Sequence, residues 1–449
     1  MNLNQSKQKK SNQNSSKGRI RPNSTSNFSL IFLLLISLSS LTQVKAQSIS
    51  DKTLMGYWHN WGPEFRLIDI PSDYNVVVIA FASTGFDGTN TFTPNYDATT
   101  FKADILALQG ENRKVLISIG GEGSSFSLSD ITQKDNFVQS MKSLIDEYNF
   151  DGLDVDLEGS SVQAIGDADF KNPSTTTSVM FLNAIDELLT HYGDSFILTT
   201  APETYYVQRG YQGFESHKGA FLPFLHKFHD RIDYLAVQLY NTPEEYGLDN
   251  ALYSSGTKDF LVSQIHMLLH GIPVGGLNAN WEDKEWLAGF DASQVLVGLP
   301  ASQTAAGSGQ ITDENLNAAL NALILGETSG LQYQKLEHGY PKLGGLMTWS
   351  INWDKDERNY GFANNFTTYL NGLSSLSLEY ATDVNFGNID ANRSYTQSYV
   401  ITNYNDAVET VNITNISEGI LINQTGFTIQ PLSSAVIELE INTTLMGTF

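Results

Sequence analysis

The sequence predicts a protein of the α/β class, a (β/α)8 TIM barrel followed by a small all-β sandwich, on three observations. Between residues 53 and 374, short apolar runs alternate with amphipathic stretches, and eight such runs are present. Beyond residue 374 the chain changes to short β-rich runs with no helical period. The 449 residues suffice for one large and one small domain, and 41% of them are hydrophobic, which is enough to build a core of that size.

The eight predicted strands are rich in Val, Ile and Leu and are bounded by Gly, Pro or polar residues, as expected of parallel strands buried on both faces. They are Thr53–Trp58, Asn75–Ala82, Lys114–Gly120, Phe150–Leu157, Phe196–Ala201, Asp233–Tyr240, Gln294–Pro300 and Gly344–Ser350. The stretches between them predict helices at Asp135–Tyr148, Ser178–His191, Lys258–His270 and Asp313–Leu325. A doubly wound open sheet is the alternative, but no GxGxxG motif follows the first strand.

Residues 1–46 predict a secretory signal peptide with a long basic leader. Residues 1–27 carry six basic and no acidic side chains, and the apolar run Phe28–Leu41 is too short to span a bilayer comfortably. Small residues stand at the cleavage positions before Gln47. An uncleaved membrane anchor is the alternative. Cleavage would remove seven basic residues and leave 19 basic against 49 acidic side chains, a net charge of −30, so we expect a secreted protein without a membrane span.

The composition excludes several classes of protein. The whole chain has a formal net charge of −23, which repels polyanions and excludes nucleic acid as a partner. Cysteine is absent, so disulfides, thiolate metal sites and cysteine nucleophiles are excluded together. We therefore expect an acidic extracellular enzyme that acts as a monomer and needs no cofactor.

The strongest chemical signal is the run from Asp151 to Glu158, DGLDVDLE. Because side chains alternate along a strand, Asp154, Asp156 and Glu158 share one face, and the apolar residues between them share the other. The apolar face must pack under the helices, so the three carboxyl groups turn into the barrel and rise about 13 Å toward its catalytic end. Acids this close share protons, and the outermost can stay protonated at neutral pH, as a general acid requires. A divalent metal site is the alternative, but no matching set of ligands is evident, and we predict none.

This run resembles the DxxDxDxE signature of glycoside hydrolase family 18, which contains the chitinases and related endo-N-acetylglucosaminidases. Four further motifs fall on the strands where that family has them. They are Ser118–Gly121, similar to SxGG on the third strand, Ala201–Glu203 on the fifth, Gln238–Asn241 on the sixth and Met347–Ser350 on the eighth. The resemblance covers about residues 53–372 and implies the barrel fold and glycoside hydrolysis.

The resemblance also implies roles for individual residues. Glu158 resembles the proton donor to the glycosidic oxygen, Asp156 the residue that turns toward it and binds the acetamido N–H, and Asp154 the buried partner that shares a proton with Asp156. Tyr240 resembles the hydroxyl that holds the acetamido carbonyl, and Trp349 the floor on which the −1 sugar stacks. Six more residues are expected to bind substrate in the same pocket: Tyr57, Phe81, Gln238, Met347, Gly121 and Asp151.

The implied mechanism needs only one catalytic acid from the protein. No second carboxylate at a separate strand end is placed by the sequence as a nucleophile, and this family is the substrate-assisted exception to the two-carboxylate rule. The acetamido oxygen of the substrate would attack the anomeric carbon, giving an oxazolinium intermediate and net retention. A substrate without an N-acetyl group is expected to fail.

The connection from Pro300 to Gly344 carries one predicted helix and little else. Family members that act processively from chain ends often insert a small α+β domain there, so its lack resembles the open cleft of endo-acting members. The expected function is a secreted endo-acting chitinase that cleaves β-1,4-linked N-acetylglucosamine polymers. The alternatives are an endo-β-N-acetylglucosaminidase acting on the N-glycan core and a non-catalytic chitin-binding lectin.

The predicted domains are a barrel over residues 47–373 and an immunoglobulin-like β-sandwich over 374–449. The sandwich strands are expected at Ser398–Asn403, Glu409–Asn415, Gly426–Ile429 and Ser434–Ile441. This region resembles the immunoglobulin-like modules of the ASPM/SPD-2/Hydin type in the runs Asn385–Asn388, Tyr399–Asn403 and Gln430-Pro431. Such modules continue with another strand beyond Phe449, so we expect this one to be incomplete. It contains no Trp, which disfavours a role in gripping crystalline chitin.

Overall fold

The computed structural model describes residues 52–373, except 163–166, 168, 215–216 and 276–283, and in the C-terminal part residues 378–379, 394–403, 408–413 and 420–442. The predicted signal peptide, the predicted start of the second domain at residue 374 and the run Asn385–Asn388 lie outside the described residues. Within the described part, no helix is long and apolar enough to cross a membrane.

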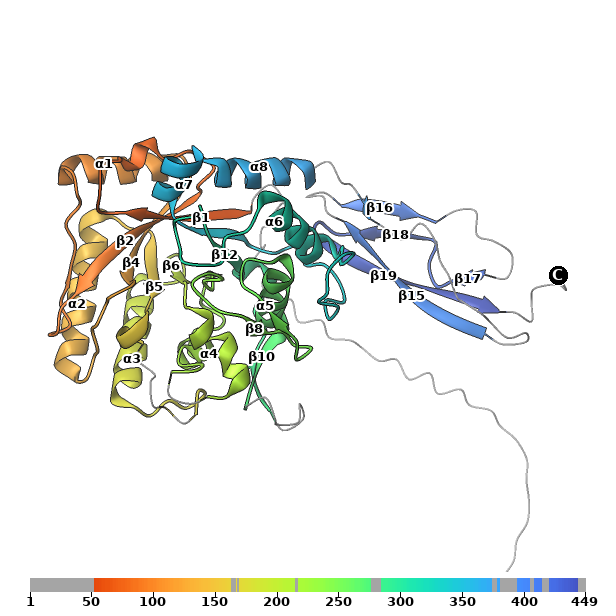
Figure 1. Cartoon of the computed structure of the whole chain (residues 1–449), viewed down its shortest axis with the longest axis horizontal. Coiled ribbons are helices and arrows are strands. Elements are labelled where there is room, and N and C mark those ends of the chain that lie inside the picture. The colour runs from red at the N-terminus through yellow and green to blue at the C-terminus, as the bar shows by residue number, and fades with distance from the viewer. Residues whose placement is uncertain are drawn as a thin grey trace, which may run out of the picture. The chain divides into compact units, whose positions relative to one another are not determined.

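Eight parallel strands form the predicted TIM barrel (Figure 1). They are β1 (Thr53–His59), β2 (Val76–Thr84), β4 (Lys114–Gly120), β5 (Gly152–Asp156), β6 (Ile197–Thr200), β7 (Tyr234–Leu235), β12 (Leu296–Pro300) and β13 (Gly345–Trp349). Their order in the sheet is β12-β13-β1-β2-β4-β5-β6-β7, the sequential order of a barrel. Single bridges from Leu235 to Val295 and from Gln238 to Gly298 join the two ends of this order and close the ring.

Helices surround the strands, and several begin at a side chain that caps their first turn. They are α1 (Ala98–Gly110), α2 (Ile131–Tyr148), α3 (Thr176–Tyr192), α4 (Leu222–Lys227), α5 (Lys258–His270), α6 (Asp313–Leu320), α7 (Ile351–Arg358) and α8 (Gly361–Leu373). The side chains of Asp97, Asp130 and Thr257 accept hydrogen bonds from backbone N–H groups of α1, α2 and α5, as good N-caps do. The four predicted helices are α2, α3, α5 and α6, and the end of the fourth, Asn321–Leu325, forms a π turn.

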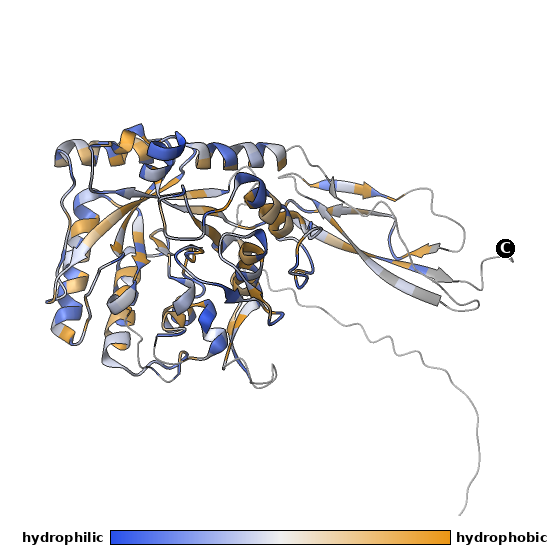
Figure 2. Ribbon diagram, viewed as in Figure 1, coloured by the Kyte–Doolittle hydropathy of each residue, from blue (hydrophilic) through white to orange (hydrophobic). Residues whose placement is uncertain are grey.

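The barrel has two apolar cores, because neighbouring residues of a strand face opposite sides. Leu54 and Trp58 of β1 belong to the large core between the strands and the helices. Met55 and Tyr57, also of β1, belong to a smaller cluster in the interior of the barrel. Figure 2 shows hydrophobic residues concentrated on the strands, whereas the helices carry both hydrophobic and hydrophilic residues. This alternation decides which side chains can reach a site inside the barrel.

The sixth barrel strand in chain order, β7, is shorter than predicted. The ladder of β7 covers only Tyr234–Leu235, whereas the sequence predicts a strand over Asp233–Tyr240. Pro202 on the β6 side has no N–H, so a regular ladder ends there, and Gln238 instead donates its backbone N–H to the Pro202 carbonyl at 2.9 Å. The rest of the segment still runs between its two neighbours, since Leu239 N–H donates to Gly298 O at 3.0 Å.

Short strands also occur outside the eight barrel strands, at places where the sequence predicts none. A hairpin of β10 (Gly271–Val274) and β11 (Glu285–Ala288) lies between α5 and β12. Another pairs β8 (Glu245–Tyr246) with β9 (Leu252–Tyr253), and β3 (Asn90–Thr91) pairs with β2. By contrast, residues 301–344 between β12 and β13 are all described and contain α6 and the π turn but no strand, as predicted.

Within the described residues of the C-terminal part, the regular structure is all β, as predicted. Its strands are β14 (Leu378–Glu379), β15 (Ser394–Asn403), β16 (Glu409–Asn412), β17 (Ile420–Ile422), β18 (Gly426–Ile429) and β19 (Ser433–Asn442). They form two antiparallel sheets, β14-β15-β19-β17 and β16-β18. Ile401, Ile429, Ile437 and Leu439 are buried together in a small apolar cluster. Four of these strands, β15, β16, β18 and β19, lie where the sequence predicts them.

Candidate active site

Three carboxyl groups line the inner face of β5 and the residues that follow it. Asp154 is completely buried, Asp156 is 3% exposed, and Glu158 lies half-buried just beyond the strand. Leu153 and Val155 point the other way, into the core under the helices. The predicted alternation along this strand is therefore confirmed.

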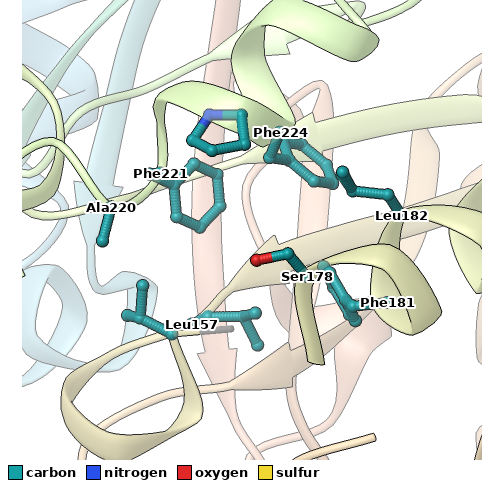
Figure 3. Close-up of a pocket in the computed structure, with 9 residues that line it drawn as sticks. Leu157, Ser178, Phe181, Leu182, Ala220, Phe221 and Phe224 are labelled. Atoms are coloured by element: carbon teal, nitrogen blue, oxygen red, sulfur yellow. The ribbon is translucent and has the colours of Figure 1, made fainter. Parts of the chain in front are cut away.

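Leu157 fixes the outer side of the segment that carries the two outermost acids. It is 1% exposed and lies beside a gap of only about 20 Å³. Figure 3 shows Leu157 facing this gap together with Phe181, Phe221 and Phe224. The gap is apolar and close to the size of one water, so it reflects packing rather than a binding site.

Asp154 is held by three hydroxyl groups. Tyr57 Oη and Ser118 Oγ donate hydrogen bonds to its Oδ2 at 2.8 and 2.6 Å, and Thr199 Oγ1 donates to its Oδ1 at 2.6 Å. Burial raises the pKa of Asp154, and the three hydrogen bonds act against that rise. Hydrogen-bond donors on β1, β4 and β6 thus fix this carboxyl group in place below Asp156.

The amide of Gln238 joins the two outer acids. Its Nε2 lies 2.9 Å from Asp156 Oδ1, 2.8 Å from Glu158 Oε1 and 2.9 Å from the carbonyl oxygen of Ala201. An amide has two N–H donors, so at most two of these acceptors take a linear bond at once. Gln238 can therefore follow either carboxyl group as charge moves between them.

The two outer acids are both poised to hold a proton. Burial, followed by the charges of Glu158 and Asp154, raises the pKa of Asp156 well above its usual range. Burial also raises the pKa of Glu158 to about 7, with further contributions from the charges of Glu203 and Glu122, although the Gln238 hydrogen bond opposes the rise. A carboxylic acid that keeps its proton near neutral pH is suited to act as a general acid.

These acids face a cavity of about 540 Å³ at the C-terminal end of the strands. Its lining residues are Phe81, Glu122, Asp156, Glu158, Glu203, Gln238, Tyr240, Asn241, Thr304, Ala305, Ala306, Gly307 and Trp349. A second cavity of about 430 Å³ shares Phe81 and Glu122 with it and is bounded further out by Asn60, Trp61 and Ser124. We call the two together the cleft. Its position is the one at which TIM-barrel enzymes have their active sites.

Tyr240 is the most deeply buried hydroxyl group of the cleft. The residue is 5% exposed, and its hydroxyl makes no hydrogen bond to the described part of the chain. Burial, followed by the charges of Asp156 and Glu158, raises its pKa well above the usual range, so it stays a neutral donor. Because this hydroxyl opens into the cavity and has no partner within the described chain, it is available to a ligand or to water.

Aromatic rings form one wall of the cleft. The Trp349 ring lies 6.0 Å from Phe81 at an interplanar angle of 17° and 4.7 Å from His59. Trp61 is 49% exposed and stacks on His59 at 4.5 Å and 9°. Burial lowers the pKa of His59 to about 4, so this ring is neutral and packs as an aromatic group. Flat aromatic faces of this kind suit the apolar faces of sugar rings.

The structure brings most of the predicted site residues together. Trp349, Phe81 and Gln238 line the cleft together with three of the catalytic candidates, Asp156, Glu158 and Tyr240. Asp154, Tyr57 and Met347 are buried beneath it at 0%, 1% and 0% exposure. Tyr57 therefore acts on the site from below, through its hydrogen bond to Asp154 and its ring contacts with Phe81 and Trp349 at 6.2 and 5.6 Å.

Glycine is required at two positions of the SxGG motif. Gly120 has φ +107°, and a Cβ there would lie 1.9 Å from the carbonyl oxygen of Asp156. Gly121 has φ +77°, and a Cβ there would lie 2.6 Å from the Phe81 ring. Both glycines let β4 leave the sheet close to β5 and the aromatic wall. Gly121 thus shapes the cleft through its backbone and does not line it.

The assignment of Asp151 to substrate binding is corrected by the structure. Asp151 lies before β5, at the end of the strand opposite the cleft. Its Oδ2 accepts hydrogen bonds from the backbone N–H of Val115 and from Gln109 Nε2, both at 2.9 Å, and Lys114 Nζ lies 3.3 Å from its Oδ1. Because Asp151 and Asp156 are five positions apart along an extended strand, the Asp151 carboxyl group joins β4 to β5 at the end far from the cleft.

Sequence reasoning did not assign a role to two acidic residues of the cleft. Glu122 follows the SxGG motif, and Glu203 ends the Ala201–Glu203 motif. A single side chain after a strand end forms no spacing pattern. Only its position at or directly after the end of a recognised motif could have indicated that it lines the cleft. No group of three or more His, Cys, Asp or Glu side chains in the described part of the chain is arranged to hold a metal ion.

Comparisons with known proteins agree with this geometry. Residues 53–387 match the family described as Glycosyl hydrolases family 18. The chain is 42% identical over 333 residues to Chitinase Chi52 of Paenibacillus xylanexedens, which covers 72% of this chain and 62% of that protein. It is 42% identical over 338 residues to Chitinase D of Niallia circulans, covering 73% and 63%. The chain thus spans less than two thirds of the length of these two curated relatives.

Among solved structures, a family GH18 chitinase from Chromobacterium violaceum has a similar fold. It matches with a TM-score of 0.65 at 32% sequence identity, and the match covers 71% of this chain and 83% of that one.

Proposed function

Because the chain belongs to glycosyl hydrolase family 18, we propose that it is a chitinase that hydrolyses β-1,4 linkages between N-acetylglucosamine units. The observation that carries this proposal is the cleft in which Glu158, with a pKa near 7, stands beside Asp156 and the unpartnered Tyr240 hydroxyl. The two 42% identical relatives are chitinases, which supports the choice of substrate.

In the proposed first step, Glu158 donates its proton to the glycosidic oxygen while the acetamido oxygen of the −1 sugar attacks the anomeric carbon. Tyr240 holds the acetamido carbonyl by donating its hydroxyl proton, and Asp156 accepts the acetamido N–H. Trp349 forms the floor under the −1 sugar. Asp156 is well placed for this because Asp154 lies below it and Gln238 bridges it to Glu158.

In the second step, the Glu158 carboxylate takes a proton from water, whose oxygen attacks the same carbon and opens the oxazolinium ring. The two displacements restore the starting configuration, so the product retains it. Glu158 ends protonated and ready for another cycle. No nucleophile from the protein is needed.

We also propose that the enzyme is secreted and endo-acting. The basic and apolar leader in residues 1–46 supports secretion. The absence of any strand from residues 301–344 supports a cleft without an additional wall on that side. The domain division at residues 373 and 374, and the immunoglobulin-like character of the second domain, remain predictions that belong to this proposal.

Product analysis on soluble N-acetylglucosamine oligosaccharides tests the proposed function. Wild-type protein is expected to cut hexamers internally and to give dimers, trimers and tetramers early in the reaction, whereas Glu158→Gln gives no measurable product in the same time. An N-glycoprotein serves as the second substrate. Cleavage of the glycoprotein alone would identify an endo-β-N-acetylglucosaminidase, and binding of oligomers without cleavage by wild type would identify a lectin.

The rate of cleavage is expected to fall about tenfold per pH unit above pH 7. The general acid works only when protonated, and the raised pKa of Glu158 keeps it protonated from its ordinary value of 4.5 up to about 7. Because a general acid is active in its protonated form, a raised pKa extends the active pH range upward. The measurement is kcat on an oligosaccharide between pH 4 and 9. An alkaline limb already centred near pH 4.5 would contradict the assignment of Glu158.

A further inference from the structure

The strand order fixes where the sugar after the cleaved bond must lie. β13, which carries Trp349, is four strands away from β5 in both directions around the barrel, so the two strands face each other across its axis. With the −1 sugar on Trp349 and the cleaved bond at Glu158, the chain continues outward past β5. The +1 sugar therefore lies over the C-terminal ends of β4, β5 and β6.

Two carboxyl groups stand at these strand ends, on either side of Glu158. Glu122 follows the end of β4 and is exposed, and Glu203 follows β6 and is half-buried. Both line the cavity that contains Glu158, and burial followed by the charge of Glu122 raises the pKa of Glu203. Both acids also act electrostatically on Glu158, because the negative charge of each contributes to the raised pKa of Glu158.

No positive charge balances these acids in the described lining of the cleft. None of the described residues that border its two cavities is Lys or Arg. The Tyr240 hydroxyl, in a side chain 5% exposed and without a described partner, marks the −1 part of the same cavity as one that receives a polar ligand. The combination favours a substrate with a positive charge next to the −1 sugar.

N-acetylglucosamine is neutral, but glucosamine, its deacetylated form, carries an ammonium group at C2. An ammonium group near Glu122 and Glu203 relieves the repulsion among the acids and gains charge-assisted hydrogen bonds. The −1 sugar, in contrast, must keep its acetamido group because that group is the nucleophile. The −1 position therefore requires an acetamido group at C2, whereas the +1 position favours an ammonium group there.

We propose that Glu122 and Glu203 select glucosamine at the +1 position, so that the preferred substrate is partially deacetylated chitin cut between N-acetylglucosamine and glucosamine. This inference rests on the proposed function. Two partly exposed charge pairs together are worth about tenfold in kcat/KM at low salt. The preference is electrostatic and is expected to weaken as ionic strength rises.

The test compares two tetrasaccharides, one fully acetylated and one with the order GlcNAc-GlcNAc-GlcN-GlcN from the non-reducing end. Wild type is expected to cut the second about tenfold faster in kcat/KM at 20 mM salt, and only between its second and third sugars, as read by mass spectrometry of the products. At 0.5 M salt the ratio is expected to approach 1. A wild-type ratio of 1 or less at low salt, with the acetylated tetramer cut, would overturn the inference.

Substitutions test whether Glu122 and Glu203 cause the preference for glucosamine at the +1 position. Glu203→Gln and Glu122→Gln are each expected to lower the ratio about threefold, and the double variant to bring it near 1. The ratio is taken within each variant, so a change in overall rate does not enter it. Glu337→Gln, an exposed glutamate that does not line the cleft, is the matched control and is expected to keep the ratio. A preference that survives the double variant would refute the role of these residues, whereas failure to cut either tetramer would refute the proposed function itself.

Discussion

Replacing Glu158 with Gln is expected to lower kcat on N-acetylglucosamine oligosaccharides by roughly three to five orders of magnitude, somewhat above a typical general-acid contribution. Glutamine keeps the shape of the side chain and its hydrogen-bonding capacity toward Gln238, but it has no acidic proton for the leaving oxygen. The substrate's acetamido group would still be in place, so a small residual rate is expected.

The initial rate of cleavage and the dissociation constant for the oligosaccharide are both measured, for the variant and for wild type. Quenching of tryptophan fluorescence by the oligosaccharide should give a Kd within a few fold of wild type, because Trp61 and Trp349 in the cleft are unchanged. Far-ultraviolet circular dichroism checks that the variant is folded. A loss of less than tenfold in kcat would mean that another group donates the proton, and Asp156 would then be the first candidate.

An oligosaccharide composed only of glucosamine is expected to be cut at least about four orders of magnitude more slowly than its N-acetylated counterpart. The nucleophile belongs to the −1 sugar in the proposed mechanism, and a well-placed intramolecular nucleophile has an effective molarity of roughly 10⁵ M or more. Tyr240 and Asp156 would also lose the acetamido group that they bind.

This result is checked with tetramers at equal concentration, followed by mass spectrometry over days. The tetramer GlcNAc-GlcNAc-GlcN-GlcN is the matched control, because it carries amines but keeps an acetamido group at the −1 position. Cleavage of the all-glucosamine tetramer at a rate near that of the control would require a nucleophile from the protein. Glu203, the half-buried carboxyl group on the next strand, would be the residue to replace in that case.

Much of the fold could be predicted because apolar runs mark buried strands. All eight barrel strands lie where such runs occur, and β18 has the predicted bounds. The hairpin of β10 and β11 could not be predicted in the same way, because Gly271–Val274 follows directly on α5 and reads as the end of its apolar stretch. Likewise β7 loses its regular ladder because of a proline on the neighbouring strand, which is a tertiary effect that the run itself does not contain.

The site could be predicted where several residues share one spacing. Asp154, Asp156 and Glu158 follow the two-residue period of a strand, and the structure places all three on its inner face. Asp151 belongs to the same motif but lies at the other end of the strand, so motif membership alone misplaced it. Glu203 could not be given a role, because its relation to Glu158 arises only when two strands lie side by side.

The alternation along β5 also limits how such an enzyme can change its substrate. Deleting or inserting one residue at the start of β5 would turn Asp154, Asp156 and Glu158 under the helices and Leu153, Val155 and Leu157 into the catalytic centre, so chemistry and folding would be lost together. Substitutions in the segments after the strands, such as those that carry Glu122 and Glu203, leave this register intact and are therefore the changes expected to alter substrate preference without unfolding the barrel.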